Sequence, residues 1–324
     1  AHKMAEWLGL CLFSLVFLEW LGARRNWHAM RQPGALLLFV ILVAALDGNL
    51  KHGHILYGIL SLLVPLALII HYWLLYRHDR DSVAAACHLR HAAAYWLLVA
   101  LAGGELAWVA GQFAPAQFAT AQFATDISLW LWLAWGLAGA LGILAALGGL
   151  RRQHWPFAPH RELYGETLPA PVALLLGAWL VYGNLTLSGG GSGLPYLPVL
   201  NPFDLIQLLA LFALWKWLRA IRSPLLPAVY GIAFLWVSAE AARLAHHWGG
   251  VPFERHALLG SFMLQSGLSL LWTAIAMGMM ITASRSKQRA LWFKGFALLA
   301  LVGGKLMLVD LSNKGTALWT LSLI

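Results

Sequence analysis

Charge is scarce in this chain. Asp, Glu, Lys and Arg make up 11% of its 324 residues, whereas hydrophobic residues make up 60%. Because about a quarter of the residues of a typical soluble domain are charged, this composition excludes an ordinary soluble domain. Basic residues outnumber acidic ones by 22 to 13, but no basic soluble segment gathers them. We therefore expect no nucleic-acid partner.

Several catalytic and cofactor-binding motifs are missing as well. The sequence has no GxSxG, no Walker A loop and no CxxC, which removes the commonest hydrolase, nucleotide-driven and thiol-redox interpretations. Its two cysteines, Cys11 and Cys87, are expected within the first apolar stretch and on the cytoplasmic side, so they do not pair with each other. No cofactor is predicted.

Ten apolar stretches organise the chain. A transmembrane helix needs roughly 20 mostly apolar residues to cross the hydrocarbon core. The second stretch is the weakest, because only residues 34–46 are cleanly apolar. The sequence predicts an all-α, polytopic membrane protein in which residues 1–324 form one helical bundle. The predicted spans are residues 5–22, 34–50, 54–76, 92–111, 127–150, 170–187, 203–221, 224–247, 257–283 and 290–309.

The connections between these stretches alternate in charge. Basic loops of polytopic proteins stay in the cytoplasm, so the alternation predicts a bacterial inner-membrane protein with both ends of the chain in the periplasm. The basic inner surface suits anionic lipid head groups. Sixteen of the 22 basic residues lie in or beside every second connection: Arg24, Arg25, Arg31, Arg77, Arg80, Arg90, Arg151, Arg152, Arg161, Lys216, Arg219, Arg222, Arg285, Lys287, Arg289 and Lys294.

Ionisable side chains gather near the predicted outer ends of several stretches. Such groups are costly inside a membrane and usually face the bundle interior or water. Glu240, Arg243 and His247 are three and four residues apart and share one face of the eighth stretch, with His246 on a neighbouring face. The candidates at the same depth on other stretches are Asp47, Glu105, Lys305 and Asp310, with His52 and His54 in an outer turn.

If these groups converge, Arg243 and Lys305 would hold an anion, and Asp310, Glu105 and Asp47 would complete the binding site. His247 and Glu240 are the candidates for acid–base catalysis. A purely structural Glu240–Arg243 ion pair is an equally weighted alternative. No metal site is predicted, because no HExxH or comparable spacing is present. The weak metal candidates are His52, His54 and His246.

One segment before the seventh stretch has a distinctive composition. Residues 188–193 read Ser-Gly-Gly-Gly-Ser-Gly, which is typical of a flexible linker, native or introduced. Asn201 and Pro202 then form a good N-cap and first-turn pair. Asp204 suits the positive end of the helix dipole. The segment therefore predicts the start of a helix.

Four sequence segments resemble those of a known family. They are Leu194 to Asp204, Arg243-Leu-Ala-His-His-Trp-Gly-Gly-Val-Pro-Phe253, Ser266 to Trp272, and Gly304-Lys-Leu-Met-Leu-Val-Asp-Leu-Ser312. Together they resemble the bacterial membrane-protein family known as domain of unknown function 2339, closely over residues 194–316 and more diffusely before them. The resemblance implies similarity to the C-terminal part of a longer polytopic protein. It implies no activity.

The leading functional hypothesis is an inner-membrane protein with a periplasm-facing polar cavity. The cavity would bind or translocate an anionic lipid or a lipid-linked glycan of the cell envelope. One alternative is an outer-leaflet transferase or hydrolase that uses His and Glu. Another is a structural subunit of an envelope complex. The expected partners are membrane lipids, other envelope membrane proteins and the remainder of a longer chain.

Overall fold

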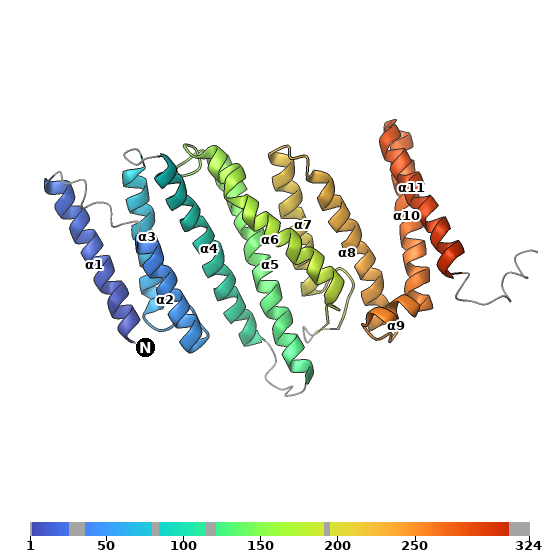
Figure 1. Ribbon diagram of the computed structural model, residues 1–324, viewed down its shortest axis with the longest axis horizontal. Helices are drawn as coiled ribbons and strands as arrows, with labels where there is room; N and C mark the ends of the chain where they lie inside the picture. The colour runs from blue at the N-terminus through green and yellow to red at the C-terminus, as the bar shows by residue number, and fades with distance from the viewer. Residues whose placement is uncertain (1, 26–35, 80–83, 114–120, 191–194, 311–324) are drawn as a thin grey trace, which may run out of the picture. The chain divides into compact units, whose positions relative to one another are not determined.

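The computed structural model describes residues 2–25, 36–79, 84–113, 121–190 and 195–310, and within these it is helical without strands (Figure 1). Arg31, Arg80, the end of the Gly/Ser run and residues 315–316 lie outside them. The helices are α1 (His2–Arg25), α2 (Leu37–His52), α3 (Leu60–His78), α4 (Ala84–Phe113), α5 (Ala121–Arg152), α6 (Pro169–Thr186), α7 (Pro202–Ala220), α8 (Leu226–His247), α9 (Arg255–Gly260), α10 (Phe262–Ser286) and α11 (Arg289–Lys305), with π-helical turns η2 (Leu163–Thr167) and η3 (Leu306–Asp310).

Nine of the ten predicted stretches each correspond to one α-helix, and the ninth covers both α9 and α10. Eight helical segments of the described chain are long and apolar enough to cross a membrane, and α2 and α7 are not among them. The helix α2 has only 16 residues, which fits the weakness of its sequence pattern. The protein is therefore an all-α membrane protein, as predicted.

The predicted ninth span begins at residue 257, and this boundary is wrong. The short helix α9 ends at Gly260, where Ser261 takes an extended backbone conformation and caps α10 by accepting from the backbone N–H of Leu264. Serine at an N-cap satisfies a backbone donor that the first turn leaves free. The apolar pattern of residues 257–283 runs through this break and hides it.

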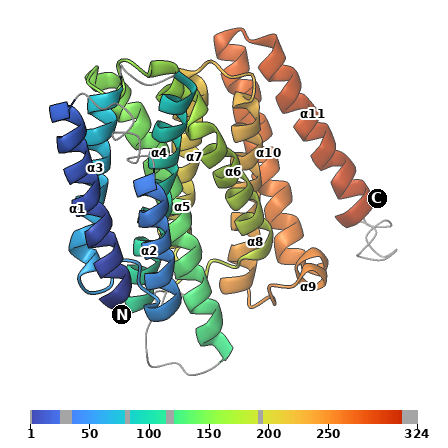
Figure 2. The same cartoon turned by 60° about the vertical axis from the view of Figure 1, so that its left-hand side comes forward.

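The chain divides into two compact units, which are described separately. The first contains residues 1–181, 191–195 and 200–230, and the second contains residues 182–190, 196–199 and 231–324. The prediction of a single domain stays a prediction. In the first unit, α1 to α4 lie beside one another (Figure 2), and they share a core of buried aliphatic residues. Examples from successive helices are Leu8, Ile41, Val64 and Ala94.

Glycines on α5 allow its neighbours to approach closely. A Cβ atom at Gly136 would lie 2.3 Å from Trp179 of α6, and one at Gly142 would lie 2.8 Å from Val99 of α4. The indole N–H of Trp179 also donates to the carbonyl oxygen of Trp132, at 3.0 Å. Small residues allow such contacts between membrane helices, so Gly136 and Gly142 have a packing role on α5.

In the second unit, α10 packs along α11. A Cβ atom at Gly295 would lie 2.9 Å from the carbonyl oxygen of Ala276. The indole N–H of Trp272 on α10 donates to the hydroxyl of Ser238 on α8, at 3.0 Å. Polar side chains often form such bonds between membrane helices.

Candidate functional site

The predicted outer site contains a closed, buried ion pair. Arg243 has 0% of its surface exposed, and its guanidinium donates to Glu240 at 2.5 Å and to the side-chain oxygen of Asn184 at 2.9 Å. The hydroxyl of Tyr196 donates to the other oxygen of Glu240, at 2.9 Å. A buried charge needs partners of this kind. Arg243 therefore ties α8 to the end of α6.

His246 and His247, which follow Arg243, each form a hydrogen bond with a backbone carbonyl group. A carbonyl oxygen only accepts, so the Nε2–H of His247 donates to Ser188, at 2.9 Å, and the ring stacks on Tyr196 with centroids 4.1 Å apart. The Nδ1–H of His246 donates to the carbonyl oxygen of Val251, at 2.7 Å. A Cβ atom at Gly190 would lie 2.8 Å from the His247 ring, so this part of the Gly/Ser run is packed.

Lys305 is engaged as well. Its ammonium donates to the backbone oxygen of Gln265 and to the hydroxyl of Ser269, both at 2.8 Å. Asp310 ends the π-helical turn η3, and its side chain lies outside the described atoms. The described contacts of Lys305 join α11 to α10.

The remaining predicted residues lie in the first unit. Asp47 pairs with Lys51 at 2.5 Å. Glu105 accepts from the ring of His54 at 3.0 Å and from the backbone N–H of Leu56 at 2.9 Å. The convergence of Asp47 and Glu105 with Arg243, Lys305 and Asp310 stays a prediction, because these residues belong to units that are described separately. The ring of His52, a weak metal candidate like His54 and His246, stacks on Tyr57 with centroids 3.8 Å apart.

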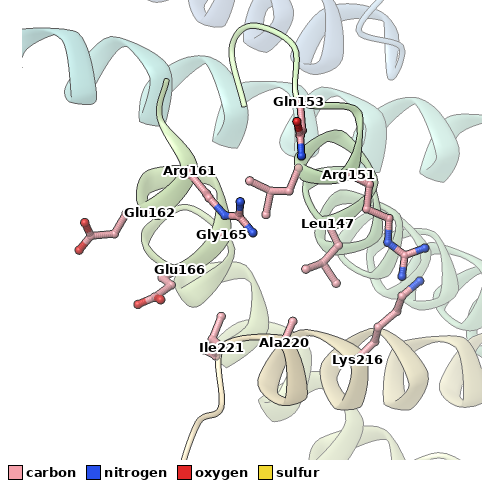
Figure 3. A pocket seen from close by; sticks show the side chains of 11 residues that line it. Leu147, Arg151, Gln153, Arg161, Glu162, Gly165, Glu166, Lys216, Ala220 and Ile221 are labelled. Carbon is pink, nitrogen blue, oxygen red and sulfur yellow. The ribbon is translucent and has the colours of Figure 1, made fainter. Parts of the chain in front are cut away.

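A large polar cavity lies elsewhere in the first unit, on the side that the charge bias assigns to the cytoplasm. We call it the basic cavity (Figure 3). Its volume is about 690 Å³, within the range of small-molecule sites. The lining residues are Leu147, Leu150, Arg151, Gln153, Arg161, Glu162, Gly165, Glu166, Lys216, Ala220 and Ile221.

The local fold explains how the cavity walls are held. The turn η2 is π-helical, and the N–H of Leu168 donates to the carbonyl oxygen of Leu163, at 2.9 Å. The indole N–H of Trp217 on α7 donates to the carbonyl oxygen of Gly165, at 2.8 Å. This bond joins the α7 wall to the η2 wall. Single π-turns of this kind are frequent at functional sites.

Charge in the basic cavity is arranged asymmetrically. The side chains of Arg151 and Lys216 point toward each other, and the guanidinium of Arg161 points into the cavity, whereas Glu162 and Glu166 point away from it (Figure 3). None of these three cations forms an ion pair with another residue of the described chain. Lys216 also lies over the ring of Phe212, 5.4 Å from its centroid. Two cations that point toward each other repel, so an anion bound between them would remove this unfavourable electrostatic energy.

In the sequence, these cations indicated the orientation of the protein and a basic inner surface suited to anionic lipids, but not a cavity. Arg151 and Arg161 belong to one predicted inner connection and Lys216 to the next. Basic residues in two successive inner connections were the available signal. Adjacent helix ends bring such connections together, but the sequence does not specify that α5 packs along α7.

The comparisons with known proteins give one match. A family model described as "Predicted membrane protein (DUF2339)" matches residues 2–324. No curated protein matches the chain, and no solved structure matches it.

Proposed function

The chain belongs to the DUF2339 family of predicted membrane proteins, and we propose that it binds an anionic lipid or lipid-linked glycan in the inner membrane. The supporting observation is that Arg151 and Lys216, which both line the basic cavity, point toward each other, and that neither forms an ion pair within the described residues. A phosphate group between them would accept a bidentate bond from Arg151 and a point-charge contact from Lys216.

The cavity also offers an apolar surface beside the cations. Leu147, Leu150 and Ile221 line it together with the polar side chains. A lipid presents the same combination, an anionic head group that continues into apolar chains. Basic pockets between transmembrane helices on the cytoplasmic side bind anionic head groups. This favours a lipid over a soluble anion such as phosphate.

The periplasm-facing cavity predicted from the sequence would be needed if the protein moves the lipid across the membrane rather than only binding it. Translocation needs a second anion site, and Arg243 is the cation that the sequence places at the predicted outer end. Arg243 would have to exchange Glu240 and Asn184 for the ligand, because both now accept from its guanidinium. Binding without translocation needs no such exchange.

The proposal is tested by lipid binding in detergent. We would titrate the purified protein with phosphatidylglycerol, phosphatidylcholine and inorganic phosphate, and count bound lipids by native mass spectrometry. The variant is Arg151→Gln with Lys216→Gln. Each basic residue near a membrane surface contributes about 1 kcal/mol to anionic-lipid binding, so we expect roughly 30-fold weaker phosphatidylglycerol binding.

A matched control carries the same change of charge. Arg152 and Arg219 are exposed neighbours that do not line the cavity, and the double variant Arg152→Gln with Arg219→Gln removes two charges from the same face. We expect phosphatidylglycerol binding within about threefold of wild type. Equal losses in both double variants would show a general effect of surface charge and would refute the site. Full displacement by inorganic phosphate would assign the cavity to a soluble anion.

A structural subunit of an envelope complex is the second candidate function. The observation in its favour is the closed network of Arg243, Glu240, Asn184 and Tyr196, in which each charge has a partner. The enzymatic alternative has weaker support, because His247 donates to a backbone carbonyl. A lower unfolding free energy of Arg243→Met, with unchanged phosphatidylglycerol binding by the folded variant, would favour the structural role for that network.

A further inference from the structure

We propose that Asp79, Cys87, His91 and His160 form a binding site for a borderline-soft divalent metal ion, with Zn²⁺ the best fit. The site lies in the first unit and shares no residue with the basic cavity. It is independent of the proposed lipid-binding function.

The donor atoms have the spacing that a tetrahedral ion requires. One nitrogen, sulfur or oxygen atom from each residue lies within 4.8 Å of all the others. With bonds of about 2.0–2.3 Å, the donors around a tetrahedral Zn²⁺ are roughly 3.3–3.8 Å apart. The Oδ1 atom of Asp79 is 3.0 Å from Cys87 Sγ, 3.4 Å from His91 Nε2 and 2.7 Å from His160 Nε2. Shifts of about 1 Å in the donor atoms would therefore bring all four to tetrahedral distances around an ion.

The ligand types match the proposed metal. A thiolate, two imidazoles and one carboxylate form a mixed nitrogen, sulfur and oxygen set of the kind that Zn²⁺ accepts. Mg²⁺ and Ca²⁺ prefer all-oxygen sites. Binding would release the thiol proton of Cys87 to solvent and form the metal–thiolate bond, while both histidines bind as neutral rings. Four protein ligands complete a tetrahedral shell, so the site would be structural.

Local structure explains why these four residues meet. Cys87 and His91 are four residues apart on α4 and share one face of the helix. Asp79 follows α3 directly, and His160 lies in the turn before η2. An ion bound to all four would join the ends of α3 and α4 to the connection between α5 and η2.

Supporting residues orient two of the ligands. Tyr164 hydroxyl lies 2.9 Å from His91 Nδ1, which leaves Nε2 turned to the cluster. The indole N–H of Trp155 donates to Asp79 Oδ2 at 2.9 Å, which leaves Oδ1 turned to the other three ligands. Partners of this kind are typical of metal-binding histidines and carboxylates.

The site also has an approach from outside. Cys87 and His91 are buried, whereas the side chain of His160 keeps 13% of its surface exposed. His160 lines a second cavity, of about 540 Å³, together with His88. The rings of these two histidines lie 5.9 Å apart. A hydrated ion entering by this cavity would meet His88 and His160 before the buried ligands.

Cobalt substitution tests the proposal directly. Purified protein, stripped with a chelator, would be titrated with Co²⁺ and followed by absorption. We expect one tightly bound equivalent per chain, tetrahedral d–d bands and a thiolate-to-cobalt charge-transfer band, all removed by one equivalent of Zn²⁺. Wild-type protein that binds no stoichiometric Co²⁺, or that binds it without the charge-transfer band, would overturn the site.

The chain supplies its own controls. Cys87→Ser should abolish the charge-transfer band, whereas Cys11→Ser, the change at the other cysteine, should leave it intact. His160→Ala should weaken Co²⁺ binding by at least about tenfold, and His154→Ala, at an exposed histidine nearby, should not. Serine still donates to Asp79, so the Cys87 variant should fold, and tryptophan fluorescence would check this. A charge-transfer band that survives in folded Cys87→Ser protein would also overturn the site.

Discussion

The closed ion pair of the second unit makes a strong prediction about stability. Arg243→Met fills a similar volume but removes the three donors that reach Glu240, Asn184 and the carbonyl oxygen of Leu187. Glu240 would then be buried with only Tyr196 as a donor among the contacts described above. Breaking a buried pair from one side costs about 3–5 kcal/mol. Glu240→Gln removes the carboxylate that pairs with Arg243 and should cost a similar amount.

The double variant, Arg243→Met with Glu240→Gln, separates charge from hydrogen bonding. With both charges gone, the amide at position 240 leaves no buried anion, so the double variant should lose far less stability than the sum of the single losses. We expect a coupling energy of about 2–3 kcal/mol, near the upper end for residues in contact. Polar contacts between membrane helices average about 0.6 kcal/mol, with a maximum near 1.7. A coupling above about 2 kcal/mol therefore identifies a charge pair.

The assay is reversible unfolding of the purified protein in mixed micelles, by titration with sodium dodecyl sulfate and detection by tryptophan fluorescence. The controls are Arg255→Met and Glu254→Gln, at exposed positions of the same unit, which should change the unfolding free energy by less than about 0.5 kcal/mol. A cost below about 1 kcal/mol for Arg243→Met, or single costs that simply add, would refute the closed pair. Arg243 would then be available to an anionic ligand.

Two further predictions concern the first unit. Gly136→Ala would place a Cβ atom 2.3 Å from Trp179 and should cost about 1–3 kcal/mol of unfolding free energy, whereas Gly177→Ala, with open space at its Cβ, should be neutral or stabilising; equal costs would refute the packing argument. The second concerns Asp79. Burial alone would raise its pKa, but hydrogen bonds from Cys87, His160, Trp155 and His91 lower the pKa from 3.8 to about 2. In metal-free protein, the Asp79 carboxylate should add stability above pH 3.8 and lose that effect as the pH falls toward 2. The difference in unfolding free energy between wild type and Asp79→Asn should therefore shrink over this interval. A difference independent of pH there would contradict the lowered pKa.

The helices could be predicted from the sequence because their cause is local. Apolar runs of membrane length specify a helix by themselves, and Asn201 with Pro202 specifies where α7 begins, with Asn201 accepting from the N–H of Asp204 as expected. The break at Ser261 was missed because an apolar pattern carries no trace of a cap. The Glu240–Arg243 contact was anticipated from a spacing of three residues.

The basic cavity and the proposed metal site could not be found in this way, because they join residues far apart in the chain. Asp79 and His160 are 81 residues apart and meet at 2.7 Å, and nothing in either neighbourhood specifies the other. Cys87 and His91, four apart on one helix, were the only local signal. A Cys and a His four residues apart on a helix can therefore belong to a metal site whose other ligands are distant in the sequence.

Arg243 and the three cations of the basic cavity differ in how readily they can bind an anion. Arg243 is fully buried, and its donors end on acceptors of the protein, so a ligand there must first break those bonds. The three cations of the basic cavity are partly exposed and have no acidic partner in the described chain. An anion adds contacts there without removing any ion pair. Since a ligand gains only the difference between new and lost contacts, the basic cavity should bind anions more tightly than Arg243. Native mass spectrometry of Arg151→Gln/Lys216→Gln beside Arg243→Met would measure that order, and stronger dependence on Arg243 would reverse it.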